Sequence, residues 1–353
     1  MKALLYEGPR QIRAADLPMV SPKTGEVLLK IKACGICGSD VHGYLGITGR
    51  RIAPMVMGHE FSGEIAEIGE GCSLGFRIGD RVTVQPVDFC GDCAPCRDGY
   101  TNTCMSKRFF GVLDVNGAFA EYLCVPEKLL YKLPDTVSFT EGALIEALAV
   151  AYGAIKKAGN LRGKNILIIG GGTIGQLVLS VVRTMEPKRV ILSDLSSFRR
   201  ETAKKRGADH VIDPGAAGCF TEEIRKLFGG ELADVTVEAV GIGPTVEQAL
   251  SALKPRGTCI WVGNNTKRVD IDMQDIVTRE LKIFGTYIYT HEEFGETIKF
   301  METTRLNLQE LITKEISLEE APDMFHRLSA APDEQLKVVV TNEEENACQI
   351  KRL

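Results

Sequence analysis

The stretch Asn165–Gly175, which reads NILIIGGGTIG, is the part of the chain that decides the fold. The apolar run before the glycines predicts a buried strand, and the apolar run after Gly175 predicts a helix. A G-x-G-x-x-G turn in this setting lets backbone N–H groups approach a pyrophosphate at the helix N-terminus. We therefore expect a dinucleotide to contact Gly170, Gly172, Thr173, Ile174 and Gly175. The alternative is a glycine-rich turn with a structural role only.

Asp194 ends the next predicted strand, RVILSD, and follows Gly175 by 19 residues. An acidic residue at this place accepts hydrogen bonds from the ribose hydroxyls and repels a 2′-phosphate, so we expect NAD as the cofactor. Arg199 lies close to Asp194 in the sequence. An arginine there contacts the same end of the cofactor and favours a 2′-phosphate, which works against the effect of Asp194.

Strands and helices alternate from Lys164 to Tyr287, as in a doubly wound parallel sheet. The N-terminal part differs, because its predicted strands are short and glycines and prolines separate them: 26–33, 61–68 and 81–85. A helix with apolar spacing is expected from about residue 140 to Gly159. A further strand is expected at 335–340. The fold class is therefore α/β, with a β-rich part before a Rossmann part.

The composition is that of an ordinary soluble protein of about two domains: 353 residues, 44% hydrophobic, 25% charged and a net charge of −5. The acidic balance argues against nucleic acid as a partner. No apolar run is long enough for a membrane span or a signal peptide, so we expect a cytoplasmic protein. Eight of the 11 cysteines lie between Cys34 and Cys124, which indicates metal or redox chemistry in the N-terminal part.

Four of these cysteines form the pattern C-x2-C-x2-C-x7-C, namely Cys90, Cys93, Cys96 and Cys104. Four thiolates this close along a chain suit a closed tetrahedral zinc site without an open coordination position, which is a structural site. An iron–sulfur cluster and free thiols are the alternatives.

A second candidate metal site combines Cys37, His59 and Glu146, which lie in CGICGSDVH, MGHEFSG and ALIEALA. A thiolate, an imidazole and a carboxylate leave a fourth position for water or substrate, the arrangement of a catalytic zinc. A carboxylate on an apolar helix also needs a partner. Cys34 and Cys37 alone read C-G-I-C, so a redox dithiol is an alternative of another class.

With these motifs in this order, the chain resembles zinc-containing medium-chain dehydrogenases of the polyol branch, which includes sorbitol and galactitol-1-phosphate dehydrogenases. The resemblance runs from residue 1 to about 341. It implies a GroES-like catalytic domain at 1–150 and 288–353, and a Rossmann NAD-binding domain at 151–287. It also implies two zinc ions per chain, and we expect a homo-oligomer, either a dimer or a tetramer.

The resemblance further implies a role for each residue of the second metal site. Cys37, His59 and Glu146 would bind the catalytic zinc, and Glu60 is an alternate ligand in such enzymes. Asp40 would orient His59 through its ring N–H. Ser39 would accept the substrate proton, and His42 would pass it to solvent. One departure is Ala147, where the branch usually has proline, and the tail beyond Thr341 has no counterpart in the family.

The expected reaction transfers hydride between a secondary alcohol and NAD, with a polyol or polyol phosphate as substrate. Arg50 and Arg51, in the loop GITGRRIAP, are candidate ligands for a substrate phosphate, because guanidinium groups bind phosphate bidentately. Threonine or butanediol dehydrogenases are the alternatives within the family. A zinc-free reductase and a binding protein on the same fold are the alternatives outside this chemistry.

Overall fold

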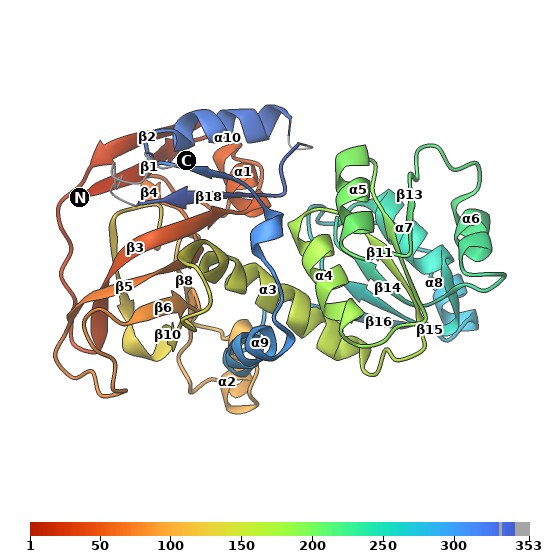
Figure 1. The fold of residues 1–353 in the computed structure, drawn as a ribbon, viewed down its shortest axis with the longest axis horizontal. Helices are drawn as coiled ribbons and strands as arrows, with labels where there is room; N and C mark the ends of the chain where they lie inside the picture. The colour runs from red at the N-terminus through yellow and green to blue at the C-terminus, as the bar shows by residue number, and fades with distance from the viewer. Residues whose placement is uncertain (332–333, 343–353) are drawn as a thin grey trace, which may run out of the picture. The chain divides into compact units, whose positions relative to one another are not determined.

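The computed structural model describes residues 1–331 and 334–342, and the chain divides into two units. One unit contains Met1–Glu146 and the chain from Asn307 onward, and the other is Ala147–Leu306 (Figure 1). The sequence analysis predicted that the chain returns to the first unit at residue 288. Helix α9 (His291–Thr304) instead belongs to the second unit, where Phe300 packs against Tyr152 with ring centroids 5.2 Å apart and ring planes tilted by 46°. The tail 343–353 lies outside the described residues.

The second unit is built on one parallel sheet of six strands, with the order β13-β12-β11-β14-β15-β16. This is the order of a doubly wound dinucleotide-binding fold, and the expected fold class is confirmed. The strands are β11 (Asn165–Ile169), β12 (Arg189–Ser193), β13 (His210–Ile212), β14 (Ala233–Glu238), β15 (Leu253–Trp261) and β16 (Lys282–Gly285).

Helices alternate with these strands along the chain, and central strands covered on both faces read as continuous apolar runs. Strand β11 shows this most clearly, because every one of its residues is buried. Besides α9, the helices of this unit are α4 (Thr173–Arg183), α5 (Ser197–Lys205), α6 (Phe220–Leu227), α7 (Gly243–Ser251) and α8 (Met273–Thr278).

The first unit is mostly antiparallel β structure, as the short predicted strands indicated. A three-stranded sheet has the order β2-β1-β4. A larger sheet has the order β10-β6-β5-β3-β18-β17, with β9 also paired to β3. The strands are β1 (Lys2–Gly8), β2 (Gln11–Asp16), β3 (Glu26–Ile36), β4 (Met55–Val56), β5 (Glu60–Ile68), β6 (Arg81–Val84), β9 (Tyr122–Pro126), β10 (Leu130–Lys132), β17 (Ile312–Ile316) and β18 (Lys337–Thr341), and β7 (Val87–Asp88) pairs separately with β8 (Arg108–Phe109).

Strand β3 holds the first unit together, because it pairs antiparallel with both β5 and β18. The C-terminal segment therefore returns to the N-terminal sheet, as the resemblance implied. Helix α1 (Gly38–Tyr44) follows β3 directly, with Cys37 as its N-cap. The other helices of this unit include α2 (Ala94–Arg97) and α10 (Ala321–Ala330), while α3 (Phe139–Ala158) runs across the boundary between the units and ends before Gly159, as predicted.

Apolar side chains from the whole length of the first unit form one core. Phe119 and Phe325, for example, are both fully buried and pack edge to face with centroids 5.8 Å apart. Two buried pairs of charged side chains, Asp40 with Arg51 and Glu60 with Lys337, interrupt this apolar interior near the end of β3. Because buried charges need partners, these pairs mark the candidate site.

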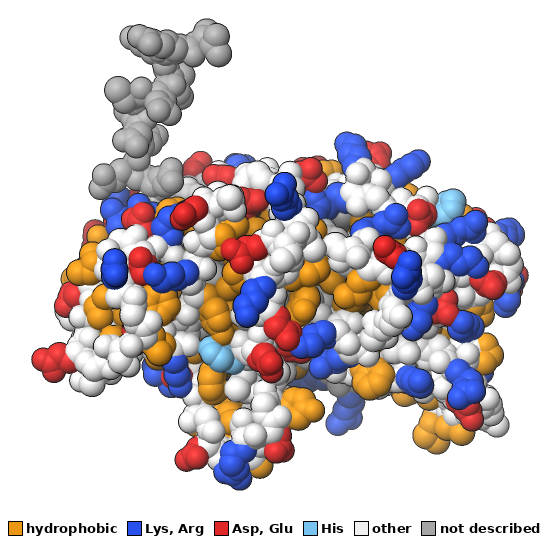
Figure 2. Space-filling model, turned by 60° about the horizontal axis from the view of Figure 1, so that its bottom comes forward, with side chains coloured by type: hydrophobic (Ala, Val, Ile, Leu, Met, Phe, Trp, Pro, Cys, Tyr) orange, Lys and Arg blue, Asp and Glu red, His pale blue; other side chains and the backbone are white. Residues whose placement is uncertain are grey.

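Within the described parts of the chain, no helix combines the length and the apolarity that a membrane crossing requires. On the face drawn in Figure 2, side chains of Lys and Arg and side chains of Asp and Glu are both present and scattered.

Candidate active site

The ligand atoms of Cys37, His59 and Glu60 all lie within 4.8 Å of one another. This convergence follows from the β3–β5 pairing, in which Gly35 is opposite Glu60. Cys37 therefore comes just after the paired position on one strand, and His59 just before it on the other. A side chain at Gly35 would collide with the Glu60 carboxylate, so the glycine of C-G-I-C provides the space for this acid.

The carboxylate of Asp40 connects two of these residues. Its Oδ1 lies 3.3 Å from His59 Nδ1, and its Oδ2 accepts a hydrogen bond from the Cys37 backbone N–H at 3.2 Å. Burial would lower the pKa of His59, but the Asp40 carboxylate and Cys37 raise that pKa well above its usual value. Because Nδ1 faces Asp40, Nε2 is the nitrogen left for a metal.

Glu60 has a partner that the sequence analysis missed. Its Oε2 lies 2.6 Å from Nζ of Lys337, and both side chains are 2% exposed. Burial would lower the pKa of Lys337, but the charges of Glu60 and Cys37 raise it. Glu146 is buried on α3 and its charge also raises the pKa of Lys337, but among the described residues the ligand atoms that converge with those of Cys37 and His59 are those of Glu60 and not of Glu146. The signal in the sequence was a lysine heading the apolar run VVV, since a buried lysine requires a partner.

Ser39 and His42 lie on α1, three residues apart, and therefore on one face of the helix. Ser39 is exposed, and its backbone N–H donates to the thiol of Cys37, two residues earlier in the chain, at 3.5 Å. The redox-dithiol alternative disagrees with the position of Cys34, which is 1% exposed and whose pKa burial raises well above the usual range. A buried, protonated thiol is inert in thiol exchange.

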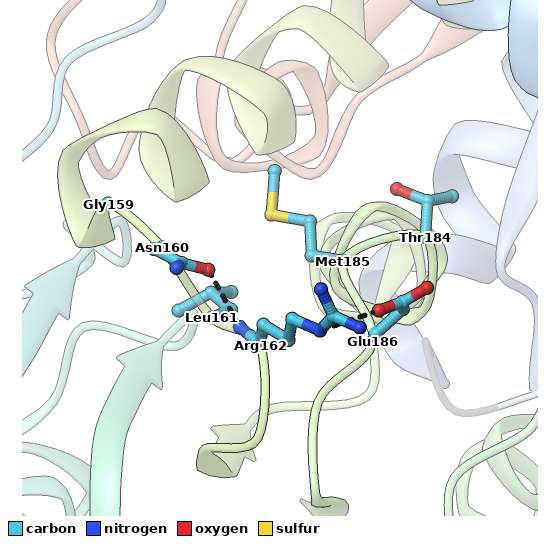
Figure 3. Close-up of a pocket in the computed structure, with 7 residues that line it drawn as sticks. All are labelled: Gly159, Asn160, Leu161, Arg162, Thr184, Met185 and Glu186. Atoms are coloured by element: carbon cyan, nitrogen blue, oxygen red, sulfur yellow. Dashed lines mark hydrogen bonds and ion pairs between the residues drawn. The ribbon is translucent and has the colours of Figure 1, made fainter.

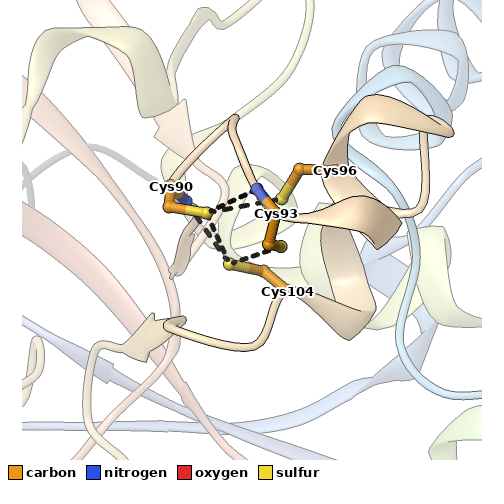
Figure 4. A group of neighbouring side chains, drawn as sticks. All are labelled: Cys90, Cys93, Cys96 and Cys104. Atoms are coloured by element: carbon orange, nitrogen blue, oxygen red, sulfur yellow. Dashed lines mark hydrogen bonds between the residues drawn. The ribbon is translucent and has the colours of Figure 1, made fainter.

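The four-cysteine candidate metal site is formed by Cys90, Cys93, Cys96 and Cys104, whose sulfur atoms converge (Figure 4). The Cys90–Cys104, Cys93–Cys104 and Cys90–Cys96 sulfur pairs are 3.5, 3.9 and 4.0 Å apart. Four ligands at about 2.3 Å from one zinc ion would be separated by roughly 3.8 Å, so one ion fits among them. An iron–sulfur cluster spreads its thiolates over several irons and fits this compact group less well.

Backbone N–H groups surround these sulfurs and favour their charged form. Cys90 Sγ accepts from the N–H groups of Asp92 and Cys93, both at 3.4 Å. Backbone donors lower the pKa of Cys93 to about 6, whereas burial raises the pKa of Cys96 to about 12. A cation among the four sulfurs would favour the thiolate form of all of them.

The glycine-rich turn has the geometry that a pyrophosphate site requires. Gly170 has a φ of +98°, and Gly172 is the N-cap of α4. A Cβ at Gly175 would collide with the carbonyl oxygen of Gly170, so the helix approaches the strand only with glycine there. A Cβ at Gly172 would meet no atom within 4 Å, which leaves open space beside the helix N-terminus. Thr173 and Ile174 form the first turn of α4.

Asp194 follows β12 and borders this turn. Its Oδ2 accepts from the Gly171 N–H at 2.6 Å, and its Oδ1 accepts from the Ser196 N–H at 2.8 Å. The guanidinium of Arg199 lies 3.8 Å from Asp194 Oδ2. Arg200 is engaged with the Asp194 carbonyl and with Asp213. The acid and an arginine therefore occupy the same end of the candidate cofactor site.

The two candidate phosphate-binding arginines are in different environments. Arg50 is exposed, whereas the side chain of Arg51 is 3% exposed and its Nη2 lies 2.7 Å from Asp40 Oδ1. The guanidinium of Arg51 is therefore occupied inside the unit, and only Arg50 presents an exposed side chain.

A hollow of about 360 Å³ lies in the second unit, lined by Gly159–Arg162 and Thr184–Glu186 (Figure 3). It borders the segment before β11 and the end of α4, and is therefore at the N-terminal edge of the parallel strands. Ligands of such sheets bind at the opposite, C-terminal edge. We therefore do not assign the hollow to the candidate site.

Comparison with known proteins identifies the family. Residues 23–135 match the family model of the alcohol dehydrogenase GroES-like domain, and residues 173–303 match that of the zinc-binding dehydrogenase. Sorbitol dehydrogenase of Bacillus subtilis is 32% identical over 344 residues, which are 96% of this chain and 97% of that protein. The chain therefore belongs to the zinc-binding alcohol dehydrogenase family, whose members are oxidoreductases acting on CH–OH groups.

The solved structures of three similar proteins match this structure over nearly the whole chain. Galactitol-1-phosphate dehydrogenase of Escherichia coli has a TM-score of 0.87 and 27% identity, covering 97% of this chain and 100% of that one. A structure described as a short chain alcohol dehydrogenase from Escherichia coli CFT073, with NADH, has a TM-score of 0.90 and 29% identity, with coverages of 97% and 99%. A neighbour from Sinorhizobium meliloti 1021 is bound to NADP, with a TM-score of 0.89, 32% identity and coverages of 97% and 99%.

Replacing Cys96 with serine should remove one zinc ion per chain and lower the thermal unfolding midpoint, because structural zinc binding contributes folding free energy. Cys219→Ser is the control, since Cys219 is exposed and outside both candidate metal sites. Metal content by atomic emission and a melting curve check this. A Cys96→Ser chain that keeps two ions and its wild-type midpoint would be incompatible with the assignment.

Replacing His59 with alanine should abolish alcohol oxidation and remove one zinc ion while the four-cysteine site keeps the other, because the catalytic ion loses its nitrogen ligand. His326→Ala is the control, since His326 is exposed on α10. Zinc content and NADH formation at 340 nm are measured in the same preparation. Wild-type turnover by the His59→Ala chain would rule out this site.

Proposed function

We propose that this chain oxidises a secondary hydroxyl of a polyol or polyol phosphate with NAD, and catalyses the reverse reduction. The observation that carries this is the convergence of Cys37, His59 and Glu60 within 4.8 Å, next to the exposed hydroxyl-bearing residue Ser39. A relative named sorbitol dehydrogenase and a structural neighbour named galactitol-1-phosphate dehydrogenase support the substrate class.

We assign the catalytic zinc to Cys37 and His59, with Glu60 or Glu146 as the third protein ligand. Glu60 is already in the group of converging ligand atoms, whereas its contact with Lys337 competes for the same carboxylate. Bound zinc would supply a Lewis acid for the alcohol oxygen, and the nicotinamide would accept hydride. The structural zinc would be held by Cys90, Cys93, Cys96 and Cys104.

In this proposal, the residues of α1 handle the proton. Ser39 Oγ accepts the proton that leaves the alcohol, and His42, one helical turn further, passes it toward water. Asp40 keeps Nδ1 of His59 occupied so that Nε2 faces the metal. The phosphate turn with Gly170, Gly172, Thr173, Ile174 and Gly175 would hold the pyrophosphate of the cofactor.

The experiment that tests this function is an NAD⁺ reduction assay with a panel of hexitols, pentitols, their phosphates, 2,3-butanediol and threonine. We expect the highest kcat/KM for a polyol or a polyol phosphate, loss of activity with a zinc chelator, and recovery when zinc is returned. Turnover that survives complete zinc removal, or a strong preference for threonine, would contradict the proposal.

We further propose that the chain works in the cytoplasm as a dimer or tetramer. None of the ten described cysteines forms a disulfide, which suits a reducing compartment. Strand β16 is at the edge of its sheet, and Phe284 on it is 42% exposed. Met273 and Val277 on the preceding α8 are 71% and 66% exposed. An edge strand with apolar side chains is a template for pairing with another chain.

Light scattering should therefore give a mass that is a multiple of 38.6 kDa, and Phe284→Lys should lower it, because the added charge opposes apolar association. Ile78→Lys in the other unit is the control for the introduction of a charge at an exposed apolar residue. A wild-type mass of one chain would exclude the oligomer, and an unchanged mass for Phe284→Lys would exclude this edge.

NAD should be preferred to NADP by at least about tenfold in kcat/KM, because the Asp194 carboxylate repels a 2′-phosphate. Asp194→Asn removes the charge and retains one oxygen, which can accept either the Gly171 or the Ser196 hydrogen bond, so it should reduce this preference. Glu201→Gln, exposed on α5, is the control. A wild-type preference for NADP would show that Arg199 dominates over Asp194.

If the substrate is a phosphate, Arg50→Ala should raise its KM by up to roughly fivefold, the effect of one exposed charge contact, and should leave the KM of the free polyol unchanged. Added salt should weaken binding of the phosphate selectively. Steady-state kinetics with a hexitol and its phosphate measure both effects. Equal changes for the two substrates would remove Arg50 from the substrate site and favour an unphosphorylated polyol.

A further inference from the structure

Arg51 is the one arginine in the described residues that is buried as a whole residue. It lies in the loop between α1 and β4, next to the exposed Arg50. Removing a guanidinium from water costs free energy unless the charge is paired and its donors are used. The contacts of Arg51 therefore show which groups compensate for the free-energy cost of burying its charge.

The guanidinium contacts two consecutive residues of α1. Its Nη2 donates to Asp40 Oδ1 at 2.7 Å and lies 3.4 Å from Ser39 Oγ, while Nη1 donates to the Arg50 carbonyl at 3.3 Å. A guanidinium has no acceptor atom, so Ser39 Oγ is the acceptor in that contact. The hydroxyl hydrogen of Ser39 is then directed to another partner.

Asp40 connects Arg51 with His59 and Cys37, the two residues that are assigned to the catalytic zinc. The oxygen that receives Arg51 is also the one that lies 3.3 Å from His59 Nδ1. The other oxygen of Asp40 holds the backbone N–H of Cys37. One carboxylate thus connects a buried arginine, an imidazole and the residue that carries the thiol.

The chain also provides space for this arginine. A Cβ at Gly43 would lie 2.5 Å from Arg51 Cγ, so the side chain fits only because α1 has a glycine there. The buried hydroxyl of Tyr6 donates to the Gly43 carbonyl at 3.1 Å and supports the same part of the helix. The side chain is therefore enclosed on the side of α1, and its direction toward Asp40 is defined by packing.

We propose that Arg51 is a positioning residue of the catalytic site, which holds the Asp40 carboxylate in the orientation that presents His59 and Cys37 to zinc and holds the oxygen of Ser39. The inference rests on the proposed function, because it takes Cys37 and His59 as zinc ligands. The competing explanation is a purely structural link between the loop and α1, which would affect stability and leave metal binding unchanged.

The test measures zinc affinity in the full chain by competition with a chromophoric chelator, with no substrate present. Arg51→Met should weaken one of the two zinc sites by about 10- to 100-fold, the usual effect of losing a group that orients a metal ligand, and should leave the four-cysteine site unchanged. Arg51→Lys keeps the charge but lacks the planar fork, so it should fall between Arg51→Met and wild type. The neighbouring Arg50→Met is the control and should bind both ions as the wild type does.

Cobalt substitution gives a second readout, because the visible absorption of cobalt depends on the geometry of its ligands. Arg51→Met and Arg51→Lys should both alter the spectrum of the Cys37–His59 site. If Arg51→Met fails to fold, Arg51→Lys decides alone. Wild-type zinc affinity and a wild-type cobalt spectrum in the folded variants, with only a lower unfolding midpoint, would overturn the inference. A wild-type chain that binds only one zinc ion, in the four-cysteine site, would contradict the proposed function and this inference together.

Discussion

The antiparallel register between β3 and β5 is the constraint on which the candidate active site depends. It places Gly35 opposite Glu60, so that Cys37 and His59 meet at the end of the strand pair. A shift of one residue would turn every side chain of one strand to the other face and separate these groups. The apolar core of the first unit therefore contributes directly to the chemistry, because it fixes this register.

Two buried ion pairs adjoin the ligand set at this point. Asp40 pairs with Arg51 on one side, and Glu60 pairs with Lys337 on the other. Burial would raise the pKa of Asp40, but His59 and Arg51 hold it far below its usual range, so this carboxylate stays ionised. Buried ion pairs are weak sources of stability, so we attribute their concentration here to the proposed role of orienting metal ligands. The four-cysteine site needs no such neighbours, because local backbone N–H groups and a short stretch of chain organise it.

The features predicted well from the sequence are those that local patterns determine. The glycine turn with its flanking strand and helix, the alternating elements of the second unit and the cysteine spacing all depend on residues close together in the chain. The resemblance added Glu60, Asp40, Ser39 and His42 to the candidate site. The Glu60–Lys337 pair joins residues 277 positions apart and depends on strand β18 pairing with β3, which no local pattern specifies.

Arg51 and the unit boundary show the same limit. Next to Arg50, Arg51 has no feature in the sequence that distinguishes a buried arginine from an exposed one. Its burial depends on the space above Gly43 and on the position of Asp40. The return to the first unit occurs at Asn307 and not at residue 288, because α9 packs on the last part of α3. Tertiary packing determines both the burial of Arg51 and the position of the unit boundary, and the local sequence pattern is compatible with a buried or an exposed arginine and with either boundary.

Anomalous diffraction at the zinc absorption edge, from crystals of the zinc-loaded chain, tests the central claim most directly. The account predicts two separate peaks per chain. One should lie among the sulfurs of Cys90, Cys93, Cys96 and Cys104, and the other within bonding distance of Cys37 Sγ and His59 Nε2. A peak in the four-cysteine site with none between Cys37 and His59 would contradict the account.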